Sequence, residues 1–204
     1  MSERLKKSEC FAEVVQSSLE GWTAQSWEWD TFPEFGSLVT VETKKRTLFG
    51  VVHQINTGSL DGNRYPFAYQ KTEAELRAEQ PQIFEFLQTT FSCLTLGFAE
   101  HEKIAYQLAP EPPKIHAFVS PMRIQEYKQF FSTDNYLPLI FSSAHLFNVD
   151  ELLLALLHTM HAQKILNKKA IASFIESFSL LTGSDYRRLK LFLQRAEKFA
   201  NAPH

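Results

Sequence analysis

The chain has 204 residues and a formal net charge of −2, and 44% of its residues are hydrophobic while 22% are charged. This balance is typical of a packed globular protein and excludes a disordered tail. Because neither sign of charge dominates, the composition gives no overall signal for a nucleic-acid or membrane partner. The length allows one compact unit or two closely packed domains.

The chain starts with a polar segment, residues 1–7, and no apolar stretch long enough for a secretory signal follows it. The longest aliphatic run, residues 152–157, is far shorter than the roughly 20 residues that a membrane-spanning helix needs. Cys10 and Cys93 stand far apart without a partner motif, which favours two buried free thiols in a reducing compartment. We therefore expect a cytoplasmic protein with no membrane partner.

Two segments rich in β-branched and aromatic residues, 37–42 and 47–55, are separated by a polar tetrad, which predicts a β-hairpin. Gly36 precedes the first strand and Gly50 lies inside the second, where a small barrel needs a turn or a sharp bend. The turn-rich segment 58–63 is expected to end the second strand.

Thr72 stands three residues before Glu75, the spacing of a capping box, and predicts a short helix over residues 72–78. Residues 91–98 and 114–119 alternate well enough to be strands. The proline-rich segment between them cannot join a sheet ladder and is expected to be an extended connector. The front of the chain is thus expected to be β-rich with one short helix.

The hydrophobic period changes from two to 3.6 near Pro121, which suits the first position of a helix that ends near Phe131. Asn148, with an acidic residue three positions later, predicts the N-terminal cap of a largely buried helix. A further helix should end at Gly183, a residue favoured in the left-handed turn after a helix, and Ser184 should cap the next one. The apolar stripes of these helices are Ile124, Tyr127 and Phe131; Leu153, Leu156, Leu157 and Met160; Ile171, Phe174, Ile175, Phe178 and Leu181; and Leu189, Phe192, Ala196 and Phe199.

Together these elements predict an α+β fold. A small N-terminal β-barrel with a short helical insertion is followed by an α-helical, bundle-like C-terminal half, because helices in series with short loops favour a bundle. The expected domains are residues 1–120 and residues 121–204.

Residues 11–16, 36–41 and 49–52 read Phe-Ala-Glu-Val-Val-Gln, Gly-Ser-Leu-Val-Thr-Val and Phe-Gly-Val-Val. In order and spacing they resemble the HAS barrel, the small β-barrel at the N-termini of rotary ATP synthase subunits and HerA-type DNA translocases. Residues 71–83 and 94–98 are similar to the insertion and the later strands of that family. The resemblance covers roughly the first 120 residues, from residue 8 onward.

The resemblance implies an oligomerisation or docking role, because in those ATPases the barrel forms a collar while a separate domain performs the chemistry. The chain departs from the family in having no Gly-x-x-x-x-Gly-Lys-Ser/Thr, and hence no cradle for nucleotide phosphates, so ATP hydrolysis is not expected. The resemblance makes residues 10–17 a strand, whereas the period of Phe11, Val14, Val15 and Leu19 indicates an amphipathic helix. We follow the resemblance there.

His158 and His161 lie three apart on a predicted helix, so both could face one metal ion. No third ligand accompanies them in the zincin spacing, which favours histidines that bind no metal, and no cofactor is expected.

Asp134, Asp150 and Glu151 show no spacing typical of a magnesium site, and the last two suit the first turn of a helix. Because no Gly-x-Ser-x-Gly or cysteine–base motif is present, no catalytic residue is predicted.

Residues 162–204 hold eight Lys and Arg residues against three acidic ones, a local net charge of +5. Such a face could contact phosphates or a partner, although basic residues on a terminal helix are usually its solvated side. Trp22, Trp27 and Trp29 could stack on bases or anchor a partner, but packing in a barrel core is favoured. The candidate contact residues are Lys168, Lys169, Arg187, Arg188, Lys190, Arg195 and Lys198.

The function that these patterns favour is a non-catalytic interaction or oligomerisation module that docks on itself or on an ATPase or translocase partner. One alternative is a nucleic-acid accessory factor that uses the basic C-terminal helices. A second alternative is a metal-dependent hydrolase that uses His158 and His161.

Overall fold

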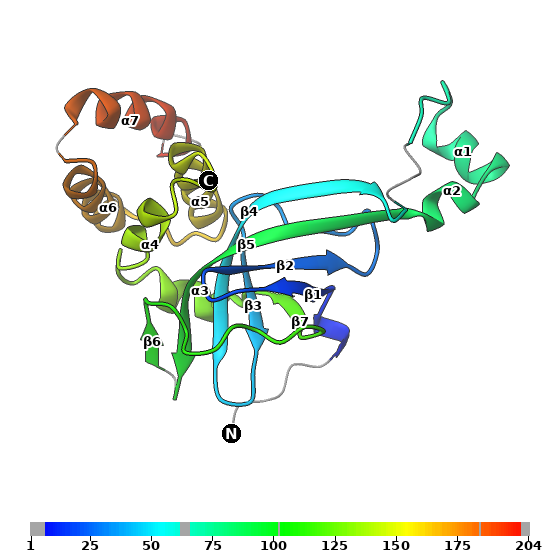
Figure 1. Cartoon of the computed structure of the whole chain (residues 1–204). Coiled ribbons are helices and arrows are strands. Elements are labelled where there is room, and N and C mark those ends of the chain that lie inside the picture. The colour runs from blue at the N-terminus through cyan, green and yellow to red at the C-terminus, as the bar shows by residue number, and fades with distance from the viewer. Residues whose placement is uncertain (1–6, 62–65, 102, 184, 201–204) are drawn as a thin grey trace.

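The chain folds into a closed antiparallel β-barrel followed by a helical half, which confirms the predicted α+β class (Figure 1). The computed structural model describes residues 7–61, 66–101, 103–183 and 185–200, the last four without their side chains. Six strands close the barrel in the order β2-β1-β7-β3-β4-β5, because β5 pairs back with β2, and β6 extends the sheet beyond β5. The strands are β1 (Ala12–Ser17), β2 (Gly21–Ser26), β3 (Leu38–Glu42), β4 (Thr47–Ser59), β5 (Leu87–Glu100), β6 (Lys103–Ala105) and β7 (Phe118–Pro121).

Side chains fill the interior of the barrel. Val39 of β3 and Trp22 of β2 belong to one buried cluster, and both are at most 3% exposed. The indole of Trp22 lies where a Cβ at position 50 would stand, so the packing of this ring requires Gly50. Cys93 lies in the same cluster and Cys10 is also buried, as expected for both thiols.

The outer face of the barrel is buried as well, where β3, β4 and β5 meet the helices. Leu38, Phe49 and Leu96 form one hydrophobic cluster with the helical half. The ring of Phe49 lies 5.5 Å from the ring of Phe130, measured between centroids. Because both faces of these strands are covered, their sequences are nearly continuous in apolar residues. The helical half therefore shares a hydrophobic core with the barrel.

Helix α5 is the most buried of the helices, and its Leu152 and Leu153 are fully covered. The side chain of Asn148 accepts hydrogen bonds from the backbone N–H groups of Asp150 and Glu151, which confirms the predicted cap. Gly183, with a φ of 65°, follows α6 as predicted, whereas Ser184 lies outside the described residues. The helices of this half are α3 (Ile124–Phe130), α4 (Leu137–Ser142), α5 (Val149–Ala162), α6 (Lys168–Leu181) and α7 (Tyr186–Ala200).

Residues 12–17 form a strand and not an amphipathic helix, so the resemblance indicated the correct structure here. Ala12 and Val14 are fully buried in the barrel, whereas Val15 is 42% and Leu19 is 45% exposed. The apolar residues of this segment therefore have no common buried face, which a helix would need.

The strand predicted over residues 114–119 is wrong in its first part. The N–H of Ala117 donates to the carbonyl of Lys114 at 3.0 Å, and His116 has a φ of 65°, so a turn precedes β7. An alternating pattern alone does not reveal such a turn.

Pro121 ends β7 and does not begin a helix. It pairs with Val39 of β3, and the N–H of Met122 donates to the carbonyl of Leu38 at 3.1 Å, so the ladder continues past the proline. A proline suits the end of a strand as well as the first turn of a helix, because both positions tolerate the missing N–H. Helix α3 starts at Ile124 instead.

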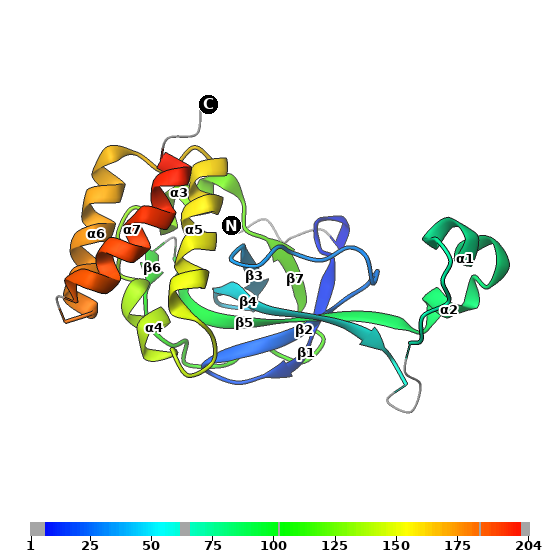
Figure 2. The same ribbon diagram turned by 90° about the horizontal axis from the view of Figure 1, so that it is seen from above.

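Strands β4 and β5 continue beyond the barrel as a two-stranded ribbon (Figure 2). We name residues 54–61 and 66–90 the arm. The arm carries two short helices at its far end, and neither helix contains a buried residue. These helices are α1 (Glu73–Glu79) and α2 (Gln82–Glu85).

The predicted capping box at the start of α1 is confirmed. The hydroxyl of Thr72 accepts from the N–H of Glu75 at 3.3 Å, and the carboxylate of Glu75 accepts from the N–H of Thr72 at 2.7 Å. These two hydrogen bonds help to explain how so short a helix begins although none of its residues is buried.

In the part of the chain that the structure describes, no helix combines the length and the apolar character needed to cross a bilayer.

Candidate interaction surfaces

The arm is held in place by the loop between β2 and β3, residues 27–35, which we name the brace loop. The indole of Trp29 stacks on the ring of Phe84 in α2, with 5.8 Å between the ring centroids. The guanidinium of Arg77 lies 4.6 Å from the centroid of the same ring and pairs with Asp30 of the brace loop at 3.6 Å. These contacts fix the direction of a ribbon that two strands alone would leave marginally stable.

The arm exposes large apolar side chains. Phe67 is 67% exposed, Leu60 is 51% exposed and Phe86 is 41% exposed. The same arm carries the carboxylate of Glu75, whose pKa is lowered by hydrogen bonds from the backbone and hydroxyl of Thr72. Exposed apolar side chains among charged ones are typical of a surface that binds another protein.

The arm and the brace loop together carry a local excess of negative charge. Residues 27–35 and 54–90 hold eight acidic residues against three basic ones. We name this part of the molecule the acidic end. The arm lies on the right-hand side of Figure 1, away from the helical half, whereas residues 31–34 of the brace loop line a groove beside α5.

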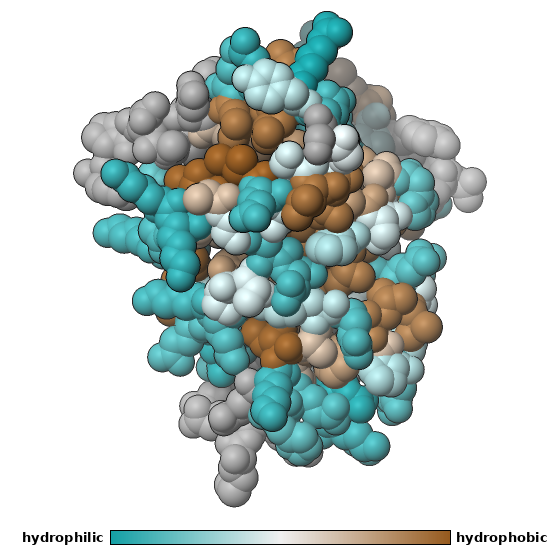
Figure 3. Space-filling model, turned by 90° about the vertical axis from the view of Figure 1, so that its left-hand side faces the viewer, coloured by the Kyte–Doolittle hydropathy of each residue, from teal (hydrophilic) through white to brown (hydrophobic). Residues whose placement is uncertain are grey.

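Helices α6 and α7 form the opposite end of the molecule, which we name the basic end (residues 162–200). Figure 3 views the molecule from this side and shows apolar side chains gathered among polar ones. The largest exposed apolar residues here are Leu180 and Tyr186, each 75% exposed, and Leu191, which is 56% exposed. The basic end therefore also presents apolar surface within a charged surround.

Two of the predicted basic contact residues turn toward α5 and form ion pairs. Arg188 pairs with Asp150 at 2.6 Å, and Arg195 pairs with Glu151 at 2.7 Å. The hydrogen bonds that Arg188 donates to Asp150 raise the pKa of Arg188, and the hydrogen bond that Arg195 donates to Glu151 lowers the pKa of Glu151. Both arginines therefore fasten α7 to the first turn of α5, and their charge is balanced within the fold.

The remaining five predicted basic residues fall into two groups. The side chain of Lys198 lies outside the described residues. Four are exposed to solvent, namely Lys168, Lys169, Arg187 and Lys190.

Lysines from two separate parts of the helical half converge near the start of α6. Lys169 lines a pocket of about 380 Å³ together with Lys128 of α3 and Lys164, and Asp134 lines the same pocket. Sequence reasoning missed Lys128 because it lies on another helix, and only the tertiary fold brings it here.

The two predicted metal ligands lie on α5. His158 lines an apolar groove of about 460 Å³ between this helix and the brace loop, and His161 is half-buried one turn further on. Among the described residues, no group of three or more His, Cys, Asp or Glu side chains is placed to hold a metal ion. Because zinc sites use at least three protein ligands, the pair alone leaves the coordination incomplete.

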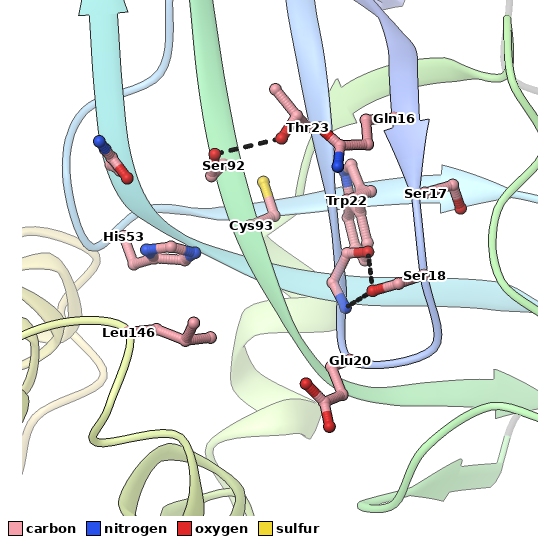
Figure 4. Close-up of a pocket in the computed structure, with 12 residues that line it drawn as sticks. Gln16, Ser17, Ser18, Glu20, Trp22, Thr23, His53, Ser92, Cys93 and Leu146 are labelled. Carbon is pink, nitrogen blue, oxygen red and sulfur yellow. Dashed lines mark hydrogen bonds between the residues drawn. The ribbon is translucent and has the colours of Figure 1, made fainter.

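A polar pocket of about 310 Å³ lies between β1, β2, β4 and β5 and contains both a histidine and a cysteine (Figure 4). Burial lowers the pKa of His53 and raises the pKa of Cys93 well above its ordinary value. Both shifts favour the neutral groups, whereas a cysteine nucleophile needs a thiolate beside a charged imidazole. The arrangement is therefore unsuited to acyl transfer.

The three tryptophans have three different environments. Trp22 packs in the barrel core as expected, and Trp29 stacks in the brace loop. Trp27 is 41% exposed and meets the ring of Phe118 edge-on at 5.5 Å, so core packing holds for Trp22 alone.

Sequence reasoning missed the arm as a separate feature. The only indication of it in the sequence is the length of the two strands that form it. The second strand of the hairpin was predicted over residues 47–55, whereas β4 extends to Ser59. No protein-family model matches this chain, and no curated protein matches it.

Proposed function

We propose that this chain is a non-catalytic interaction module that docks on a protein partner through its arm. The observation that carries this proposal is an arm that projects from the barrel, is held in a fixed direction, and exposes Phe67, Leu60 and Phe86. Fully burying a side chain of this size contributes about 2 kcal/mol. A partner that covers all three therefore gains a substantial part of its binding free energy from them.

The chemistry of the interior supports the same proposal. Side chains occupy the barrel core, and the histidine and cysteine of the polar pocket are held in their neutral forms. A filled barrel serves well as a rigid base for a projecting element.

The finer proposal is that the chain is a stand-alone HAS barrel that docks on itself and on an ATPase or translocase partner. It is supported by the strand at residues 12–17 and by the short helices inserted between β4 and β5, where the resemblance has its insertion. Because the chain has no phosphate-binding motif, the partner would supply the nucleotide hydrolysis.

Site-specific photo-crosslinking in the source cell tests the proposal. A photoreactive phenylalanine analogue at position 67 is expected to form a crosslink to a protein, because this side chain is the most exposed of the three apolar side chains of the arm named above. The matched control carries the same analogue at Ile115, which is 49% exposed but lies outside the arm. Equal crosslinking at both positions, or none at position 67, contradicts the proposal.

The lysines near the start of α6 favour nucleic-acid binding as a second candidate function. Lys128, Lys164 and Lys169 line one pocket, and phosphate contacts of this kind make binding strongly dependent on salt. Replacing Lys128 and Lys169 by alanine is expected to weaken DNA binding and to reduce its salt dependence, measured by fluorescence anisotropy. An absence of DNA binding at low salt removes this candidate.

A further inference from the structure

The acidic end and the basic end match each other in both charge and apolar content. The acidic end has eight acidic residues against three basic ones, and residues 162–204 have eight basic residues against three acidic ones. Each end thus has a local charge of magnitude five, and the signs are opposite. The arm and helices α6 and α7 lie on opposite sides of the molecule in both ribbon views (Figures 1 and 2), so the arm of one copy cannot reach α7 of the same copy.

Each end also presents apolar side chains within its charged surface. On the acidic end these are Phe67, Leu60 and Phe86. On the outward face of α7 Tyr186 and Leu191 are exposed, at 75% and 56%. An apolar centre with a polar rim is the usual anatomy of a protein interface, and here the two rims carry opposite charge.

The basic rim beside these α7 residues consists of charges that the fold does not neutralise. Arg187 and Lys190 are exposed, and each lies one turn from an exposed apolar residue, Lys190 from Tyr186 and Arg187 from Leu191, since residues four apart are neighbours on a helix surface. Neither forms an ion pair with an acid in the described part of the chain, in contrast to Arg188. They are therefore available to a partner.

On the acidic end the corresponding charges are Glu85 of α2 and Glu28 of the brace loop. Both are exposed, and neither forms an ion pair within the described residues. Glu85 directly precedes Phe86, so an exposed charge and an exposed apolar residue are neighbours along the chain of the arm.

We propose that the acidic end of one copy docks on the basic end of a second copy. Contacts between two acidic ends or two basic ends bring like charges together, which costs free energy, whereas contact between unlike ends is favourable. The contact is therefore head to tail, and such contacts build rings when the rotation closes and open chains when it does not. This inference rests on the proposed function, because it names the partner of the arm.

Charge-reversal variants test the proposal through sedimentation velocity at low and high ionic strength. An arm variant combines Glu28→Lys with Glu85→Lys, and a helix variant combines Arg187→Glu with Lys190→Glu. The unchanged protein is expected to assemble at low salt and to dissociate at about 0.5 M salt, where charges are screened within a few ångströms. Each variant alone is expected to self-associate at least tenfold more weakly.

Mixing the two variants provides the decisive measurement. The arm variant offers a basic arm and the helix variant offers an acidic α7, so an equimolar mixture is expected to recover assembly that neither shows alone. Lys44→Glu and Glu111→Lys, at exposed positions outside both ends, serve as matched controls and should assemble like the unchanged protein. Thermal unfolding of every variant checks that it is folded.

Several outcomes overturn the inference. A monomer at low salt, undiminished assembly of both variants, or a mixture that stays dissociated each contradicts head-to-tail contact. Assembly that disappears on nuclease treatment shows nucleic acid bridging the copies and also contradicts it. A monomer whose position 67 still crosslinks to another protein refutes this inference but leaves the proposed function standing.

Discussion

Gly36 has a φ of 80° at the point where the barrel meets α5, and a Cβ at this position would collide with Ala155. Two separate costs therefore oppose a side chain here, namely the left-handed backbone and the lack of space. The sequence indicated only that a turn residue precedes the first strand of the hairpin. The contact with a helix more than 100 positions later in the chain belongs to the tertiary structure.

Gly36→Ala is expected to lower the free energy of unfolding by about 2–4 kcal/mol, because strain and overpacking add. Gly183→Ala shares the positive φ but has open space around it, so it should cost about 1 kcal/mol. Gly58→Ala introduces neither backbone strain nor a steric clash, so it should change the free energy of unfolding little. Urea unfolding of the three variants measures these differences, and equal losses at positions 36 and 183 would contradict the steric argument.

The stability of the protein should depend on pH through His53. Burial lowers the pKa of His53 below its usual value of 6.5, so the unfolded chain binds this proton more readily than the folded chain. The contribution of His53 to stability is therefore complete above about pH 6.5 and is lost as the pH falls through that value toward the lower folded pKa.

Urea unfolding of the unchanged protein and of His53→Phe between pH 7.5 and pH 5 measures this effect. The variant should lose less stability on acidification, because it has no proton to take up at this position. The same decrease in both proteins would show that His53 does not contribute to the pH dependence.

At the scale of elements, the arm owes its direction to the brace loop and not to its own two strands. Trp29 stacks on Phe84 of the arm, and its backbone carbonyl also accepts a hydrogen bond from the hydroxyl of Thr89 in the arm. Because neither arm helix buries a residue, the arm should open without unfolding the barrel.

Trp29→Ala is expected to speed amide hydrogen exchange in α1, α2 and the outer part of the ribbon, while the global unfolding midpoint changes little. Trp27→Ala is the matched control, since Trp27 lies in the same loop but contacts Phe118 of the barrel. Unchanged exchange in the arm of the Trp29 variant would mean that the loop does not hold it.

The ion pairs between α5 and α7 should differ in strength. Arg188 meets Asp150 through several hydrogen bonds and also lies 5.7 Å from the ring centroid of Phe178, whereas Arg195 and Glu151 are exposed. Arg188→Ala is expected to cost about 1 kcal/mol, because a well-oriented arginine–carboxylate pair exceeds an ordinary surface pair. Arg195→Ala should cost less, and thermal unfolding that ranks them in the opposite order would contradict this assignment.

At the scale of the whole molecule, the shared core between the barrel and the helices predicts a single cooperative unfolding transition. Phe49, Leu38 and Leu96 would be exposed to water if the helical half separated from the barrel. The division into domains at residue 120 remains a prediction, and strand β7 (Phe118–Pro121) extends across that position.

The tryptophans make this expectation measurable, because all three lie within the first 29 residues and report on the barrel and its brace loop. Tryptophan fluorescence and the helical circular-dichroism signal should change at the same temperature. Two separate midpoints would instead support two domains that unfold independently.

How much of the fold the sequence predicted depended on how local each signal is. The hairpin of β3 and β4, the capping box at Thr72 and the cap at Asn148 were predicted correctly, because each depends on residues within a few positions of one another. The turn before β7 and the position of Pro121 at the end of that strand were not predicted. An alternating pattern fits a turn as well as a strand, and a proline fits the end of a strand as well as the start of a helix.

The sequence by itself determined the α+β class, the hairpin and the apolar stripe of α5, since side-chain period and turn chemistry act over short distances. In the other predicted stripes Ile124 and Leu181 are exposed, at 44% and 38%. Only the tertiary structure decided which surfaces remain exposed. It paired Arg188 with Asp150, 38 positions apart, and so removed one predicted contact residue, and it brought Trp29 against Phe84 and so fixed the arm. Such contacts depend on the path of the whole chain, which no local pattern records.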